Sequence, residues 1–235
     1  MRSFWLLTLL PIVACESVES KDIGTDAMSA EIEVISSDGA STRVNTTLRV
    51  GGLTSNTYVE LTGDDQLTAD DGSGAIGMSY LSIGDYWTYI ADFSVAAGDT
   101  PFTVALVRSL DGGAPSSTAS MPAPFDLTAP ADAAVFSRAS DPITVTWDPS
   151  ASADGMVVRL SSDCTLESTQ DVAGDPGTYT FEVGSYEVAD GSEAESCEGT
   201  VTVERRRAGT LDEAFGEGGE VYAAQRREVK IRLDP

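Results

Sequence analysis

The feature that most constrains this chain is an alternation of apolar and polar residues with a period of two, interrupted by glycine-containing turns. In residues 42–50, Val44, Thr46, Leu48 and Val50 alternate with arginine, asparagine and threonine, as in a half-buried strand. Similar segments occupy residues 31–35, 57–62, 75–81, 86–94 and 102–108. Since no window of eleven or more residues has helical spacing, the sequence predicts an all-β fold of the sandwich or small-barrel type.

The strand pattern divides the chain into two blocks. Residues 28–114 suffice for a first small β-sandwich, and residues 115–124, rich in proline and serine, are predicted to form a linker. Residues 125–235 form the second block. Its strand candidates are residues 134–137, 143–147, 156–161, 178–183, 200–205, 220–223 and 228–233. We therefore expect two tandem antiparallel β-sandwiches.

The second block carries a recognisable strand pattern. The segment Ile143-Thr-Val-Thr-Trp147-Asp-Pro149, followed by residues 156–160 and by residues 179–183, resembles the fibronectin type III pattern. The resemblance implies an Ig-like sandwich with the tryptophan in its core. One departure is that Trp147 precedes both cysteines of the block, so these cysteines are not expected to form the inter-sheet bridge of antibody domains.

The N-terminus has the layout of a signal peptide, with one basic residue followed by about ten apolar residues. Its end, Ile12-Val13-Ala14-Cys15, resembles the lipobox of bacterial lipoproteins. The resemblance implies removal of residues 1–14 and acylation of Cys15, for instance with palmitate, which anchors the chain to a membrane. The alternative is an ordinary cleaved signal with a chance cysteine, although Ile12 is bulkier than such a cleavage site prefers.

Two further expectations concern the start of the mature chain. Residues 15–27 hold the lipidated cysteine and a polar, acidic stretch without periodicity, which indicates a flexible spacer. The residue after the cysteine is Glu16, where the family's inner-membrane retention signal has aspartate. The resemblance therefore favours the outer membrane.

The cysteine count fits this interpretation. Three cysteines in an exported chain leave one unpaired, unless Cys15 carries lipid and Cys164 pairs with Cys197. The two lie 33 positions apart, and we expect the disulfide to fasten a long loop or a strand edge. The alternative is a pair of buried free thiols.

Charge and the missing histidine exclude several functions. With 14 basic and 38 acidic residues, the net charge of −24 makes nucleic acid an improbable partner. The absence of histidine excludes Ser-His-Asp and Cys-His catalysis. We therefore expect a non-enzymatic envelope module that binds a protein or a glycan, or that has an adhesive or structural role. The alternative is a hydrolase that uses carboxylates or a metal.

Four carboxylates gather around a predicted turn. Asp64, Asp65, Asp70 and Asp71 lie within eight positions, and oxygen ligands on such loops suit Ca²⁺. The spacing fits no EF-hand, because Leu67 stands where an oxygen ligand belongs. We expect these residues to form solvated acidic turns, and the alternative is a calcium site, which would make the chain a calcium-stabilised adhesive module.

Two further patterns give surface hypotheses. In residues 86–93, Trp87, Tyr89, Ala91 and Phe93 share one strand face, which we expect to be buried, whereas Tyr86 lies on the other face as a candidate ligand contact. Seven of the fourteen basic residues lie in residues 204–235, beside seven acidic ones. They either pair with neighbouring acids or form a basic face toward anionic lipid.

Overall fold

The computed structural model describes residues 16–83 and 86–235, which form strands, turns and two short 3₁₀ helices, η1 (Ser20–Asp22) and η2 (Thr25–Ala27). The strands are β1 (Glu16–Glu19), β2 (Met28–Ser36), β3 (Thr42–Val50), β4 (Thr57–Glu60), β5 (Gln66–Asp70), β6 (Ile76–Gly77), β7 (Ser79–Ile83), β8 (Tyr86–Phe93), β9 (Pro101–Val107), β10 (Ala114–Ser120), β11 (Asp126–Ala129), β12 (Ala134–Ser137), β13 (Ile143–Asp148), β14 (Gly155–Ser162), β15 (Thr165–Val172), β16 (Thr178–Phe181), β17 (Cys197–Ala208) and β18 (Glu220–Asp234). In these residues no helix is long and apolar enough to cross a bilayer. The all-β expectation is confirmed.

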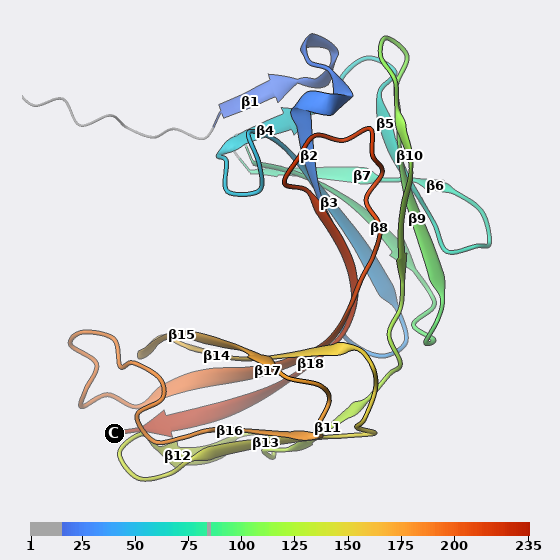
Figure 1. The fold of residues 1–235 in the computed structure, drawn as a ribbon. Helices are drawn as coiled ribbons and strands as arrows, with labels where there is room; N and C mark the ends of the chain where they lie inside the picture. The colour runs from blue at the N-terminus through green and yellow to red at the C-terminus, as the bar shows by residue number, and fades with distance from the viewer. Residues whose placement is uncertain (1–15, 84–85) are drawn as a thin grey trace, which may run out of the picture.

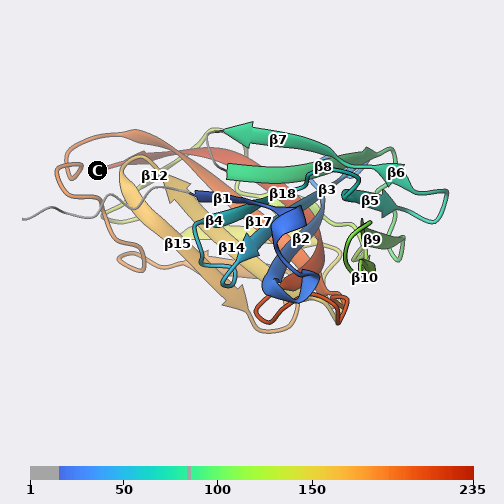
Figure 2. The ribbon, with the colours of Figure 1, turned by 90° about the horizontal axis from the view of Figure 1, so that it is seen from above.

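Three sheets make up the molecule. The largest has eleven strands, with the path β1-β4-β3-β2-β18-β17-β14-β15 and with β7, β8 and β12 joined to it at the side. A four-stranded sheet, β10-β9-β5-β6, and a three-stranded sheet, β11-β13-β16, complete the two sandwiches. Figures 1 and 2 show the large sheet bending, and Figure 1 shows the two smaller sheets on the outer side of the bend. The opposite side, which we call the inner face, is left uncovered by them.

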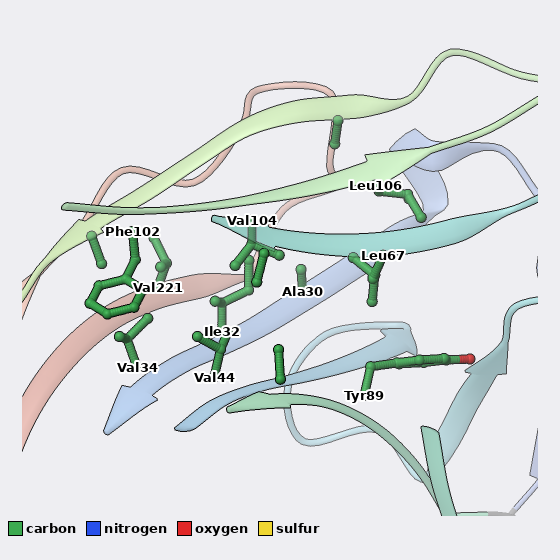
Figure 3. Packing of buried hydrophobic residues seen from close by; sticks show 14 of the residues in the cluster. Ala30, Ile32, Val34, Val44, Leu67, Tyr89, Phe102, Val104, Leu106 and Val221 are labelled. Atoms are coloured by element: carbon green, nitrogen blue, oxygen red, sulfur yellow. The ribbon is translucent and has the colours of Figure 1, made fainter. Parts of the chain in front are cut away.

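Each smaller sheet encloses its own apolar core against the large sheet. In the first core, Ile32, Val34 and Val44 from the large sheet meet Leu67 and Phe102 from the small one (Figure 3). Along each strand every second side chain points into this core, because successive side chains alternate between the two faces of a sheet. Tyr89, Ala91 and Phe93 are buried there, as their alternation predicts, whereas Trp87 on the same face is only half-buried.

The second core lies between β11, β13 and β16 on one side and the far half of the large sheet on the other. Trp147 is 3 % exposed in this core, as its fibronectin-like position implies. Its neighbours include Val158, Val201 and Leu233. Burying such side chains stabilises the fold by about 25 cal/mol for each Å² of apolar surface removed from water.

The two sandwiches are not separate along the chain. Strand β17 pairs over its whole length with β18, and the first part of β18 pairs in parallel with β2. Consequently Phe215, Val221 and Ala223 lie in the first core, although the sequence places them in the second block. The expected division at residues 125–235 is therefore wrong for residues 209–225, which return to the first sandwich.

The expected linker is largely a strand. Residues 114–120 form β10, paired with β9, and the side chains of Ser117 and Ala119 are buried. Proline and serine suggest a linker, but Pro115 is tolerated because β10 lies at the end of its sheet, where a missing N–H costs no ladder hydrogen bond. After β10, residues 121–125 pass from Met121 in the first core to Phe125 in the second.

The expected flexible spacer is folded from Glu16 onward. Strand β1 pairs in parallel with β4, and the two 3₁₀ helices follow it directly. Ser20 is fully buried, and Thr25 is 4 % exposed. The polar composition misleads here, because the segment is held by hydrogen bonds to the first sandwich more than by apolar packing.

Cys164 and Cys197 form a disulfide, which confirms the expected pairing. Cys164 lies in the turn between β14 and β15, and Cys197 begins β17, the neighbour of β14 in the large sheet. The bond therefore lies within one sheet. It closes the excursion that contains β15, β16 and the long loop before β17.

Reduction of this disulfide is expected to lower the free energy of unfolding by about 3–4 kcal/mol, because the open chain gains loop entropy when it unfolds. The measurement is denaturant unfolding of the oxidised and reduced chain, with a mass gain of about two daltons to verify reduction. Equal midpoints in the two forms would contradict the expectation. A Ser162→Ala variant at the end of β14 serves as the control, with the disulfide intact.

Candidate functional site

The inner face presents polar side chains from consecutive strands of the large sheet. On β2 these are Glu31 and Glu33, on β3 they are Asn45, Thr47 and Arg49, and on β8 they are Tyr86 and Thr88. The intervening residues of the same strands point into the first core. These seven side chains line a cavity of about 390 Å³, which we call the inner-face pocket.

Ion pairing and aromatic contacts fix the geometry of this pocket. Arg49 Nη1 lies 2.5 Å from Glu31 Oε2. The Arg49 guanidinium lies 5.3 Å from the ring centre of Tyr58, and that ring packs edge-on against Tyr86 at 5.0 Å. On the neighbouring strand β18, the Tyr222 hydroxyl donates a hydrogen bond to the Glu33 carboxylate of β2. Burial and this carboxylate both raise the pKa of Tyr222, so the phenol stays protonated.

One donor beside the pocket has no protein partner. The Arg49 side chain is 12 % exposed, and its buried Nε atom makes no hydrogen bond to any described residue. A buried donor without a partner costs roughly 1–3 kcal/mol, and this Nε atom is shielded from solvent, so it does not itself face the pocket. The pocket thus offers hydroxyls, an amide, a guanidinium, two carboxylates and an aromatic ring, which suit a ligand rich in hydroxyl groups.

An acidic residue is held between two arginines next to this pocket. Glu204 is 1 % exposed, and its two oxygens lie 2.6 Å from Arg206 Nε and 2.6 Å from Arg226 Nε. Arg206 also stacks over Tyr222 at 4.5 Å. Burial alone would raise the pKa of Glu204, but the two guanidinium charges lower it below its ordinary value. This cluster connects the inner faces of the two sandwiches.

The Glu204 cluster gives a pH-dependent prediction. Because the pKa of Glu204 is lower in the folded state, its stabilising contribution is present above the unfolded pKa and is lost as the pH falls through the folded pKa. We expect Glu204→Gln to destabilise the chain at pH 7 by about 2 kcal/mol and to make the loss of stability between pH 5 and pH 2 smaller. Denaturant unfolding at several pH values measures both effects. Exposed Glu228→Gln on the same face is the control, and an unchanged pH profile in Glu204→Gln would contradict the prediction.

The four aspartates considered as a calcium site do not come together. Asp65 lies before β5 and pairs with buried Arg108, whereas Asp70 and Asp71 lie at the other end of β5. Asp70 accepts hydrogen bonds from the backbone of Gly72 and Gly74, and Asp71 from Ser73. Asp64 is exposed. Across the described ranges no three metal-ligating side chains gather, so the calcium alternative is wrong.

The remaining predicted sites have different outcomes. Cys15 lies outside the described residues, so its acylation stays a prediction. Tyr86 lines the inner-face pocket. The C-terminal arginines mostly have acidic partners: Arg205 pairs with Asp175, Arg206 and Arg226 with Glu204, Arg207 with Asp154 and Asp99, and Arg232 with Asp234. These pairs favour the first of the two interpretations given for the basic segment.

Sequence reasoning missed the other pocket residues. Glu31, Asn45 and Arg49 each occupy an outward position in a correctly expected strand, so their exposure was foreseeable. These residues lie beside Tyr86 because of the order of strands in the sheet. The alternation of apolar and polar residues along one strand does not predict that order.

Comparisons with known proteins find similar solved structures at low sequence identity. No protein-family model and no curated protein sequence matches the chain. Among solved structures, a chimeric titin Z1Z2 carrying a decorin peptide is 13 % identical, with 90 % of this chain and 98 % of that chain covered and a TM-score of 0.25. The FN1–FN3 domains of chicken CNTN1 are 9 % identical, with coverages of 90 % and 68 % and a TM-score of 0.30. A cytokine receptor complex is 15 % identical, with coverages of 83 % and 94 % and a TM-score of 0.26. At such scores the likeness carries no argument about function.

Proposed function

We propose that this chain is a non-enzymatic binding module of the bacterial cell envelope, anchored by acyl chains on Cys15, and that it binds a glycan in the inner-face pocket. The lipobox-like segment before Cys15 supports the anchor, and the residue Glu16 favours the outer membrane. The pocket itself supports the binding role. The observation that carries it is the inner-face cavity itself, which Asn45, Thr47, Arg49 and Thr88 line with hydrogen-bonding groups beside Tyr86.

A sugar fits this chemistry better than an apolar ligand does. Seven polar or aromatic side chains line the pocket, and sugar hydroxyls can accept from Arg49 and exchange hydrogen bonds with Thr47 and Thr88. Glu31 neutralises Arg49, and Glu33 leaves the pocket with one net negative charge, so the pocket does not favour an anionic ligand. The proposed partner is therefore a neutral oligosaccharide.

Two measurements test the parts of this proposal separately. The intact mass of the membrane-extracted protein is expected to equal residues 15–235 plus acyl groups, and Cys15→Ala is expected to abolish acylation. A glycan array is then probed with wild-type protein, with Arg49→Met and with the matched exposed variant Arg43→Met. Binding that Arg49→Met abolishes and Arg43→Met retains supports the pocket. Binding that survives Arg49→Met, or no binding to any neutral oligosaccharide, contradicts it.

A further inference from the structure

The strand β7 exposes an apolar edge. Leu81 is 50 % exposed, Ile83 is 73 % exposed, and Tyr80 is 64 % exposed. Leu81 and Ile83 share one side of the strand, and their partners across the hairpin are Thr88 and Tyr86 of the inner-face pocket. No residue of β7 is charged.

Such an edge is unusual on a protein surface. β7 pairs only with β8, so one side of the strand has backbone groups without strand partners in the described part of the chain. Proteins ordinarily protect such edges with charges or proline, because an apolar unpaired strand associates with other surfaces. The chain has 52 charged residues, but none lies in this strand. This indicates that the strand edge is an interaction surface, for a lipid bilayer or for another molecule.

The position of this edge identifies what covers it. Strand β1 is paired with β4 from Glu16 onward, and Ser17 is the register partner of Tyr58. The Tyr58 ring in turn contacts Tyr86, which is the partner of Ile83. Figures 1 and 2 both place the start of β8 near β1 and β4. Glu16, the residue bonded to Cys15, is the register partner of Thr57, so the described chain begins beside this hairpin.

We propose that the β7–β8 hairpin rests on the lipid bilayer beside the acylated Cys15, with Leu81 and Ile83 in the boundary between headgroups and acyl chains. The inference rests on the proposed anchor at Cys15. Tyr58 and Tyr86 suit the same boundary, where an aromatic ring meets an apolar phase and its hydroxyl stays in water. The contact stays interfacial, because the unpaired backbone groups of β7 cannot enter hydrocarbon without loss of their hydrogen bonds to water.

This arrangement gives the protein a fixed orientation instead of a loose tether. No flexible spacer separates Cys15 from β1, so the first sandwich lies against the membrane and the inner-face pocket opens close to it. The edge-to-edge pairing of β7 with a second copy is the competing occupant. The bilayer is favoured over a second copy because the proposed acyl anchor keeps this strand next to the bilayer at all times.

The test uses a tryptophan that the hairpin already contains. After signal cleavage the tryptophans are Trp87, on β8 opposite Ser82, and Trp147, which is 3 % exposed in the second core. The acylated full-length mature protein is placed in vesicles of phosphatidylethanolamine and phosphatidylglycerol with or without brominated acyl chains. Trp87 points to the opposite face of the two strands from Leu81 and Ile83, one sheet thickness away, so we expect bromine to quench Trp87 partly and to leave Trp147 unaffected. Leu81→Ser/Ile83→Ser is expected to lose most of this quenching while remaining in the membrane fraction.

The control variant is Val135→Ser/Leu166→Ser, which replaces two apolar side chains of similar exposure in the second sandwich. Its Trp87 fluorescence should be quenched by bromine as much as that of the wild type. Melting temperatures verify that all variants are folded. An acylated, vesicle-bound wild type without quenching overturns the hairpin contact and leaves the anchor standing. A dimer in detergent that Leu81→Ser/Ile83→Ser converts to a monomer assigns the edge to a second copy and also overturns it. An unacylated chain overturns the anchor, and the hairpin contact with it.

Discussion

Replacing Arg205 with methionine is expected to lower the free energy of unfolding by about 3–5 kcal/mol, because it leaves a buried carboxylate without its partner. The side chains of Arg205 and Asp175 are 1 % and 0 % exposed, and Arg205 Nη2 lies 2.8 Å from Asp175 Oδ2. Arg205 also donates to the carbonyls of Ala123, Pro124 and Pro149. Denaturant unfolding of the variant and the wild type measures the loss.

The location of this arginine explains why the effect should extend to both sandwiches. Ala123 and Pro124 belong to the crossing between the two cores, and Asp175 also accepts from Trp147 Nε1 at 2.6 Å in the second core. Burial alone would raise the pKa of Asp175, but the hydrogen bonds from Trp147 and Ser152 and the charge of Arg205 lower it. The pair thus holds the crossing segment against the second sandwich.

A double-mutant cycle separates the ion pair from the other contacts. Arg205→Met/Asp175→Asn is expected to be less destabilised than the sum of its single variants, since neither buried charge then remains alone. The control is Arg232→Met, whose partly exposed pair with Asp234 should contribute less than about 1 kcal/mol. If Arg205→Met loses no more free energy of unfolding than Arg232→Met does, the buried Arg205–Asp175 ion pair does not stabilise the fold as proposed.

The strand pattern could be predicted wherever burial is local. Residues 42–50 form β3 within the expected bounds, and Val44, Thr46 and Leu48 point inward as their alternation requires. Strand β18 shows where this reasoning fails. Gln225 is fully buried and donates to carbonyls of Ala96 and Pro122, so polar residues interrupt the pattern and suggest two short strands instead of one long strand.

The same limit applies to domains and to the site. The parallel pairing of β18 with β2 joins residues almost two hundred positions apart, and no local pattern encodes such a partner. Tyr86 could be identified as an outward aromatic residue from its position opposite a buried face. The pocket around it could not, because Glu31 and Arg49 reach it only through the order of strands in the large sheet.

Replacing Arg108 with alanine is expected to release the N-terminal segment and to cost about 3–5 kcal/mol of stability. The Arg108 side chain is 1 % exposed, and its Nε lies 3.0 Å from Asp65 Oδ2, which is also buried. It donates further to the carbonyls of Ser20 and Ile23 and to the hydroxyl of Thr25. One side chain at the end of β9 therefore fastens residues 20–25, the middle of the stretch that the sequence suggests to be a spacer.

Hydrogen exchange distinguishes local release from general unfolding. In Arg108→Ala the backbone amides of residues 17–25 should exchange much faster, whereas those of β13 and β16 in the second sandwich should keep their protection. Arg43→Ala, which breaks an exposed pair with Asp92, is the control and should change little. Unchanged exchange of residues 17–25 would contradict the role of Arg108. In the acylated protein the same variant should weaken bromine quenching of Trp87, because a freed segment becomes the flexible tether that the native fold does not have.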